Sequence, residues 1–344
     1  MKKRILIYIV FACLFCINMH AQVFVIERGT NTTLTFDNIK SAVDALADGD
    51  RLYIPSGTHN LGLYNWEEYD ESAETNRIVL SRAVVINKKV AIYGGGYYGD
   101  NASALTNGTI VLDQNASGSY ITGIRFENLR LNNVSNLNIS RCRITTDLLC
   151  NGYGGNNMFS ECDINTTTYY SSTDLGIIAT KCIFHHSNQS LKSSTVKNSI
   201  FVNYSSSSWY FTNSYFYNNI FVIDKTKVGV AGEINGNDPN MYINNLFVGG
   251  ELNSETNSTF QNNITKIAYT DTFVNGNEGN YHLLDNSVAK NAGTDGTDIG
   301  IYGTTSPFND NRMPALPYFK VKVIGTETDA TGKLPVEIII EAQD

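Results

Sequence analysis

The chain has 344 residues and a formal net charge of −8, from 33 acidic and 25 basic residues. An acidic balance of this size argues against nucleic acid as a partner, because phosphate binding needs a basic face. It also disfavours, on average, binding to anionic membrane surfaces and to polyanionic sugars.

The N-terminus has the pattern of a secretory signal peptide. Residues 2–4 are basic, and residues 5–17 form an apolar stretch that is too short to span a membrane. A small residue at the end of the segment predicts a signal peptide over 1–21. A lipidated start at Cys13 or Cys16 is the alternative, although the residues before both fit a lipidation box poorly. We therefore expect an exported protein, secreted or on the outer cell surface with the periplasm as an alternative, and no later transmembrane segment.

The first part of the mature chain predicts a cap and a loop. Apolar residues at helical spacing in 36–47 predict a helix that covers the N-terminal end of the fold, and 52–54 reads as a strand. A stack of repeats needs such a cover to avoid an exposed core and an unpaired strand edge. Residues 60–77 are acidic and break the pattern. They predict an exposed loop, either simply solvated or forming the rim of a ligand site.

A short phrase then returns about every twenty residues, as in RCRI, ECDI and KCIF. A fixed period in this range indicates stacked supersecondary units. One short strand phrase in each unit leaves no room for a covering helix, so the sequence predicts an all-β fold, a parallel β-helix. The second residue of each phrase marks the repeat: Cys142, Cys162, Cys182, Ser199, Asn219, Asn245 and Asn263.

Alternation of side chains across a strand assigns the inner face of each coil. It places Cys142, Cys162 and Cys182 inside, as a ladder of free thiols at equal spacing. A disulfide between two of them is the alternative, and it would leave the third alone. Cys150 lies outside the phrase, next to Asn-Gly, and is expected in a turn.

The other face of the same phrases carries charges. Arg141, Glu161 and Lys181 form one predicted outward column, and Arg143 and Asp163 form a second. Opposite charges in neighbouring strands stabilise the register by about 0.2–1 kcal/mol per pair. This charged patch is the candidate catalytic site. A plain salt-bridge ladder is the alternative and is favoured, because flanking cations keep both carboxyls ionised and so disfavour a general acid.

An aromatic stretch surrounds a serine run at 205–208. Rings left outside the coil can stack on sugar faces, so Trp209, Tyr210, Tyr215 and Tyr217 are the candidate substrate-binding residues. The alternative is that half of these rings point inward. Since Trp209 and Tyr210 have opposite phase, we expect one of them to be exposed.

Two further features concern metals and the C-terminus. His185 and His186 are adjacent, so they point to opposite faces of a strand and predict no metal site. After a β-helix domain over 22–303, residues 304–344 contain a proline-bearing linker and two strand-like runs. They predict a C-terminal β hairpin, either a cap or an anchor or secretion signal.

Two segments resemble a known superfamily. Residues 39–60 resemble the first coil of pectate-lyase-like β-helix proteins, with Gly-Asp before a strand and Pro-x-Gly-Thr after it. Residues 281–303 resemble the closing segment of secreted bacterial β-helix proteins of the choice-of-anchor Q type, with Tyr-x-Leu, Ser, Asn-Ala-Gly and Asp-Ile-Gly in this order. The resemblance covers roughly residues 23–303. It implies a right-handed β-helix and export, and handedness also follows by analogy with other parallel crossovers.

The resemblance does not select an activity, because the superfamily includes lyases, hydrolases, esterases and proteins without catalysis. The chain has no Asp-Asp and no His-Gly pair, which counts against a pectin-hydrolase-like site. A lyase would use Lys181 or Arg141 as its base, with calcium on Glu161 and Asp163. Two carboxylates among three cations suit calcium poorly.

We therefore expect an exported carbohydrate-interacting protein without catalysis or a cofactor, whose partner is a polysaccharide or surface glycan. A lyase acting on a uronate-containing polysaccharide is the alternative, and a structural or adhesion protein is a third. Calcium is expected only for the lyase. If the chain is an enzyme, the sequence favours a lyase over a glycoside hydrolase.

Overall fold

The computed structural model describes most of the chain after the N-terminal segment. The predicted signal peptide, His186 and the serine run at 205–208 lie outside the described residues. Those that are described are 23–29, 32–62, 64–70, 75–98, 102–169, 174–185, 189–202, 209–226, 230–232, 239–252, 257–311, 318–324, 328, 332–333 and 336–341.

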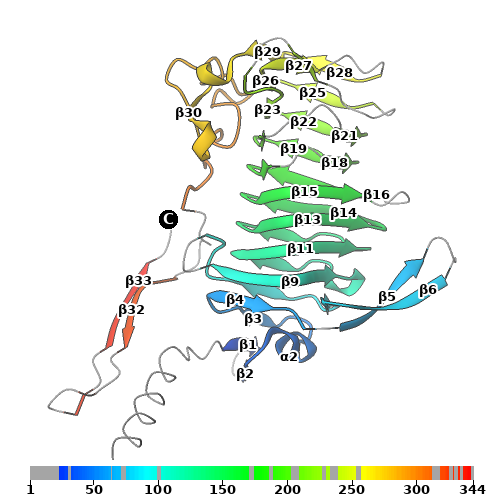
Figure 1. Ribbon diagram of the computed structural model, residues 1–344, viewed down its shortest axis with the longest axis vertical. Coiled ribbons are helices and arrows are strands. Elements are labelled where there is room, and N and C mark those ends of the chain that lie inside the picture. Colours follow the sequence, from blue (N-terminus) through cyan, green and yellow to red (C-terminus); the bar gives the residue numbers. More distant parts are fainter. Residues whose placement is uncertain are drawn as a thin grey trace, which may run out of the picture.

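The fold is a parallel β-solenoid in which the chain passes repeatedly from a first sheet to a second (Figure 1). From β3 onward the strands of the first sheet pair in parallel, as do those of the second. In spatial order the first sheet contains β2 (Thr32–Phe36), β1 (Phe24–Arg28), β3 (Arg51–Tyr53), β8 (Ala91–Tyr93), β10 (Tyr120–Thr122), β12 (Asn138–Ser140), β14 (Tyr153–Ser160), β16 (Asp174–Thr180), β19 (Thr195–Lys197), β22 (Tyr215–Tyr217), β25 (Met241–Ile243) and β28 (Thr259–Gln261).

The second sheet lies beside the first, and its strands stack along the solenoid in the same chain order. Its main path contains β4 (Gly57–Asn60), β9 (Ser103–Leu112), β11 (Ile124–Asn132), β13 (Arg143–Asn151), β15 (Asp163–Tyr169), β17 (Ile183–Phe184), β20 (Ile200–Phe201), β23 (Ile220–Val222), β26 (Leu246–Val248) and β29 (Ile264–Ile267). Beside this path lie β7 (Ala83–Ile86), β18 (Gln189–Lys192) and β21 (Trp209–Thr212).

Backbone hydrogen bonds confirm that the repeat markers lie in consecutive coils. The carbonyl of Cys142 accepts a hydrogen bond from the Asp163 N–H at 2.9 Å, and that of Cys162 accepts one from Ile183 at 2.8 Å. The same contact joins Ser199 to the coil that follows it. Each marker therefore lies one strand spacing from the next, as the period predicts.

Each phrase, which the sequence predicts to be one continuous strand, contains a corner between two strands. The residue before the marker has a left-handed backbone, with φ of 49° at Arg141, 53° at Glu161 and 55° at Lys181. The first sheet ends there, and the second begins two residues later. This one residue redirects the chain from the first sheet to the second, so that a coil needs only about twenty residues.

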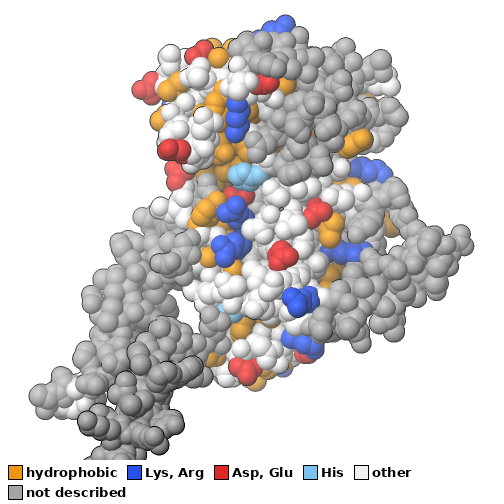
Figure 2. All heavy atoms as spheres, viewed as in Figure 1, with side chains coloured by type: hydrophobic (Ala, Val, Ile, Leu, Met, Phe, Trp, Pro, Cys, Tyr) orange, Lys and Arg blue, Asp and Glu red, His pale blue; other side chains and the backbone are white. Residues whose placement is uncertain are grey.

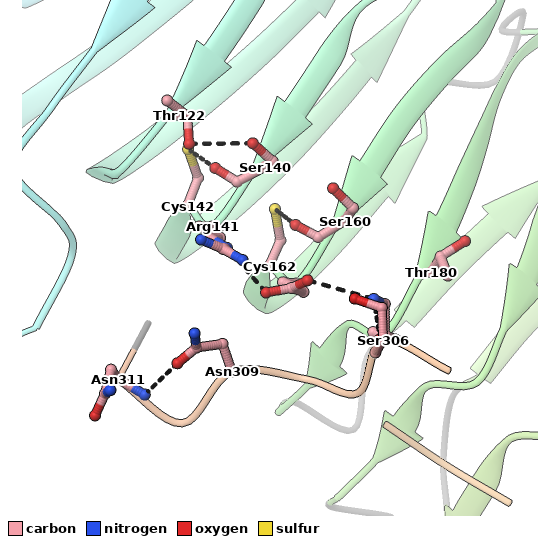
Figure 3. Close-up of polar contacts among 12 residues, drawn as sticks. Thr122, Ser140, Arg141, Cys142, Ser160, Cys162, Thr180, Ser306, Asn309 and Asn311 are labelled. Carbon is pink, nitrogen blue, oxygen red and sulfur yellow. Dashed lines mark hydrogen bonds and ion pairs between the residues drawn. The ribbon is translucent and has the colours of Figure 1, made fainter. Parts of the chain in front are cut away.

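The interior confirms the inward ladder of thiols. Cys142, Cys162 and Cys182 are buried and free, and Figure 3 shows the first two on neighbouring coils. Burial raises the pKa of Cys142 to about 12 and that of Cys162 well above its ordinary value, so both thiols are uncharged. Cys150 is also free and buried, but it lies within β13, so the predicted turn is wrong.

Polar markers continue this ladder in later coils and are satisfied internally. The Oδ1 atom of Asn219 accepts from the Ser199 N–H at 2.9 Å, and that of Asn245 accepts from the Asn219 N–H at 2.9 Å. A second such ladder lines another corner, which the sequence analysis missed. There the Oγ atom of Ser194 accepts from the Ile177 N–H at 3.2 Å, and that of Ser214 accepts from the Ser194 N–H at 3.2 Å. At these corners, side-chain oxygens thus accept hydrogen bonds from backbone N–H groups that no strand partner can satisfy.

The N-terminal end differs from the expected helical cap. Its helix, α2 (Ile39–Asp44), has six residues and begins at Asn38, whose side chain accepts from the Ser41 N–H. The antiparallel strands β1 and β2 extend the first sheet at this end. Most of the predicted loop at 60–77 belongs to an antiparallel pair, β5 (Tyr64–Asp70) with β6 (Thr75–Ser81), which extends past the predicted end and projects from the stack (Figure 1).

The remaining strands form small pairs. Two are antiparallel, β30 (Phe273–Asn275) with β31 (Asn280–Leu283) and β32 (Tyr318–Ile324) with β33 (Val336–Glu341). A third pair, β24 (Val230–Gly232) with β27 (Gly250–Leu252), is parallel. Short 3-10 turns occur at η1 (Gln114–Ala116), η2 (Tyr269–Asp271) and η3 (Gly276–Glu278).

A closing segment, residues 281–311, packs against the outside of the second sheet. Ile183, Ile200 and Ile220 point outward there, yet they are buried against Ile299 and Ile301. The Gly300 N–H donates to the Asn218 carbonyl at 2.8 Å, and a Cβ at Gly300 would lie 2.7 Å from Ile220. The segment thus gives the solenoid a second apolar core on its outer surface.

Candidate functional site

The first charged column forms the contacts that the sequence predicts. Glu161 lies between two cations, with its Oε2 2.9 Å from Arg141 Nε and its Oε1 3.3 Å from Lys181 Nζ. The column is less exposed than expected, since the Glu161 side chain is only 11% exposed. Lys181 Nζ also donates to the carbonyl of Ser306 at 2.6 Å, so the closing segment reaches this corner (Figure 3).

The residues of this column have a left-handed backbone conformation, which is energetically unfavourable for side chains such as Arg, Glu and Lys. Left-handed φ suits Gly and Asn, and in the coils after Lys181 the same corner holds Asn198, Asn218 and Asn244. Arg141 and Glu161 adopt it at a cost on the order of 1–2 kcal/mol per residue. Local backbone preference therefore does not explain the charged side chains here, and strained residues of this kind are concentrated at functional sites.

The second charged column is centred on Asp163, which the sequence analysis placed on the outer surface. Its side chain is only 1% exposed, because Tyr98, Arg143 and His185 surround it. The Asp163 Oδ1 atom lies 2.8 Å from His185 Nε2 and 3.8 Å from Arg143 Nε. Its Oδ2 atom accepts a hydrogen bond from the Tyr98 hydroxyl at 3.3 Å. Arg143 in turn lies over the Tyr98 ring, 5.0 Å from its centroid.

The three residues around Asp163 remain accessible to a ligand. The side chains of Arg143 and His185 are 33% and 29% exposed, and Tyr98 is 40% exposed. Figure 2 shows basic side chains and a histidine gathered at this edge of the sheets. We name Tyr98, Arg143, Asp163 and His185 the Asp163 cluster.

The carboxylates do not fit the calcium site considered for a lyase. Both oxygens of Glu161 lie near cations, and those of Asp163 lie close to Arg143 and His185 and accept a hydrogen bond from Tyr98. Calcium prefers several uncommitted oxygen ligands. No group of three or more His, Cys, Asp or Glu that could hold a metal occurs within the described part of the chain.

Sequence reasoning missed Tyr98 and His185 as members of this cluster. Tyr98 is 65 positions from Asp163 and belongs to a segment without the repeated phrase, so no signal pointed to it. His185 follows the phrase at 181–184 directly, and its place one coil beyond Asp163 could have been read from the period.

The aromatic stretch divides between the inside and outside of the coil. Trp209 is 0% exposed and packs against the rings of Phe201 and Phe221, whereas Tyr210 is 52% exposed. This confirms that one of the two neighbours is exposed, and it removes Trp209 from any external contact surface. Tyr215 is 46% exposed.

Tyr217 is half-buried, and the Lys197 Nζ atom lies over its ring at 5.4 Å. It stands two residues from Tyr215 on the same face of β22, because side chains alternate along a strand. The exposed rings at Tyr210 and Tyr215 thus lie on consecutive strands, β21 and β22, on either side of one corner of the same coil.

No family model matches the chain, and no curated protein matches it. Among the described residues, no helix is long and apolar enough to cross a membrane.

Proposed function

We propose that this protein is an exported, carbohydrate-binding β-helix protein, and that Tyr210, Tyr215 and Tyr217 belong to its glycan-contacting surface. The observation that carries the proposal is the exposure of Tyr210 and Tyr215 on short, paired strands whose neighbouring rings, Trp209 and Phe216, are buried. Rings held in this way lose little conformational freedom when a ligand stacks on them. Their combination of an apolar face and a hydroxyl suits a sugar ring.

The surface around Tyr215 continues along the axis of the solenoid. Register pairs connect Tyr215 through Thr195 and Ile178 to Met158, which is 47% exposed. These outward positions are spaced at about 4.8 Å, the distance between paired strands. An extended polysaccharide lying along the axis would therefore meet similar contacts in successive coils, which favours a polymer over a small sugar.

Replacing Tyr210 or Tyr215 with Ala should weaken glycan binding by about tenfold, since a good ring contact contributes on the order of 1 kcal/mol or more. Affinity electrophoresis with a panel of soluble polysaccharides measures the effect. The matched control is Tyr153→Ala, which removes a tyrosine that is 69% exposed on another coil. Equal weakening by all three changes, or binding that none of them alters, would show that the strip at 210–217 is not the contact surface.

We also propose the finer features that the sequence suggests. These are right-handed winding, kinship with the pectate-lyase-like superfamily and its choice-of-anchor Q type, and a location in the secreted fraction or on the outer cell surface. They include a β-helix domain over 22–303 followed by a C-terminal β segment over 304–344. The buried Ile39, Ala42 and Val43 of α2 support a capping role for this short helix.

Two alternative functions make different predictions. A structural or adhesion protein without glycan affinity would show no saturable binding to the polysaccharide panel. A lyase acting on a uronate-containing polysaccharide would release unsaturated uronates. One observation favours the lyase over the expectation of no catalysis: the accessible His185 next to the buried Asp163 and the cationic Arg143.

A further inference from the structure

We propose that two copies of this chain pair end to end through β28, the last strand of the first sheet. Within the described residues β28 pairs only with β25, and it lies at the end of the stack opposite α2 (Figure 1). Its three residues, Thr259, Phe260 and Gln261, are all exposed. An edge strand of this kind presents unpaired N–H and C=O groups to a second strand.

A stack of aromatic rings in the core ends at β28 with its last ring exposed. The Tyr242 ring is stacked on Phe216 on one side, at 5.0 Å between centroids, and on Phe260 on the other side, at 4.9 Å. Phe216 and Tyr242 are fully buried, whereas Phe260 occupies the same inward position and is 38% exposed. One more inward side chain beyond Phe260 would complete its burial, as each ring of the stack does for the one before it.

The ladder of buried asparagines ends at the same coil. The Asn245 N–H donates to the Asn263 Oδ1 atom at 2.8 Å, and the Asn263 Nδ2 atom donates to the Tyr242 carbonyl at 2.9 Å. Within the part of the chain that the structure describes, the Asn263 N–H has no side-chain acceptor from a further coil. This end of the solenoid therefore presents both polar and apolar groups that earlier coils satisfy by stacking.

The sequence around β28 has none of the usual protection against strand pairing. Residues 256–265 contain no charged residue and no proline. Exposed edge strands generally carry charges or proline, which keep other strands away. The segment 256–265 is thus suited to a partner strand rather than to solvent.

The opposite end of the solenoid identifies the partner strand as another β28. The apolar side chains of α2 are buried against the core, and its exposed side carries an ion pair, Lys40 with Asp44, whose side chains are 39% and 48% exposed. A head-to-tail contact would bury this ion pair against Phe260, and removing charges from water is costly. Two β28 ends bring only uncharged strands together. Such a contact uses the same surface on both copies and closes as a dimer.

A two-fold axis through this contact makes the two β28 strands antiparallel. Phe260 then lies opposite Phe260 of the other copy, and Thr259 lies opposite Gln261 of the other copy. The two first sheets become one continuous sheet with both outer faces on the same side. Tyr215 is two strands from the edge, through Met241 and Thr259. The two glycan-contacting surfaces would lie about 24 Å apart, five strand spacings, and could bind one long polymer bivalently. This bivalent binding rests on the proposed function, whereas the pairing of β28 does not.

Sedimentation velocity of the purified chain over a series of concentrations tests the pairing without any glycan. We expect a reversible equilibrium between monomer and dimer. A double variant, Thr259→Lys with Gln261→Lys, places lysines opposite each other across the axis and should weaken dimerisation about tenfold, because like charges directly opposite destabilise paired strands. The double variant Thr259→Glu with Gln261→Glu should do the same. An equal mixture of the two should form a mixed dimer, since each lysine then faces a glutamate.

The matched control is Thr33→Lys with Thr35→Lys, the same exchange at exposed positions of β2, the first sheet's other edge. It should leave dimerisation unchanged. Weakening by this control would indicate a head-to-tail contact and overturn the proposal, as would a chain that stays monomeric at every concentration. Dimers that the changes at Thr259 and Gln261 do not weaken would exclude β28 as the contact. Failure of the mixture to dimerise would overturn the antiparallel arrangement. None of these outcomes bears on glycan binding, which the polysaccharide panel measures separately.

Discussion

Cys162→Asp should destabilise the fold by at least about 4 kcal/mol at neutral pH. Cys162 is buried between Cys142 and Cys182, and burial raises the pKa of the Cys142 and Cys162 thiols, so both are uncharged. A carboxyl in such surroundings has its pKa raised by about 3–5 units, and each unit corresponds to 1.36 kcal/mol. Urea unfolding of the purified variant measures the loss.

The pH dependence provides an internal check. The introduced carboxyl has a higher pKa in the folded chain than in the unfolded chain, so its penalty develops as pH rises above about 4, the unfolded value. Relative to the unaltered protein, Cys162→Asp should therefore recover stability as pH falls towards 4. Cys162→Ser is the control for loss of the sulfur alone, and it should cost less and show no such recovery.

Glu161→Gln tests the opposite side of the same corner. The sequence predicts an exposed ion pair, and exposed pairs contribute little. Because Glu161 is in fact largely buried between Arg141 and Lys181, we expect a larger loss than for a surface pair, but a smaller one than for Cys162→Asp. A loss as large as that of Cys162→Asp would contradict the assignment of Cys162 to the inside and Glu161 to the outside of the coil.

The solenoid could be predicted because each coil repeats the same chemistry at the same place. Cys142, Cys162 and Cys182 mark the inner face at equal spacing, and their polar counterparts Ser199 and Asn219 continue the column. The period and the alternation of side chains were sufficient to give the stacking order and the ion pairs of Glu161. Both are local consequences of the sequence.

The corner within each phrase was not predicted, because three of its residues are atypical for a left-handed backbone. Asn198, Asn218 and Asn244 are typical of this conformation, but Arg141, Glu161 and Lys181 are not. In the first of these coils, the RCRI phrase at 141–144 alternates as a continuous strand would. Only the asparagines at the same position in the later coils indicate the left-handed corner.

The burial of Asp163 could not be predicted from the repeat. It depends on Tyr98, which comes from another coil, and the neighbouring corner depends on Ser306, 125 positions from Lys181. Contacts between segments so far apart leave no periodic trace. One indirect signal was present, since Ile183 and Ile200 place apolar side chains on an outer face that must be covered.

Asn219→Leu should destabilise the fold by about 2–6 kcal/mol, although the two side chains have similar volumes. The Asn219 side chain is fully buried and hydrogen-bonds to the preceding coil and to Asn245 in the following coil. Its Oδ1 accepts from the Ser199 N–H at 2.9 Å, and its Nδ2 donates to the Val196 carbonyl at 2.9 Å. Leu leaves both backbone groups buried without this partner, at about 1–3 kcal/mol each.

Two further variants separate this cause from a general loss of packing. Asn138→Leu makes the same exchange at an exposed, outward position and should change stability by less than about 0.5 kcal/mol. Asn219→Ser should recover part of the loss, because Ser199 occupies the same position one coil earlier and its Oγ accepts from the Cys182 N–H at 3.0 Å. Stability should thus fall in the order Asn, Ser, Leu in thermal unfolding. If Leu proved as stable as Asn, hydrogen bonds along the ladder would not be what holds these coils in register, and apolar stacking of Phe201 on Phe221 would be the better explanation.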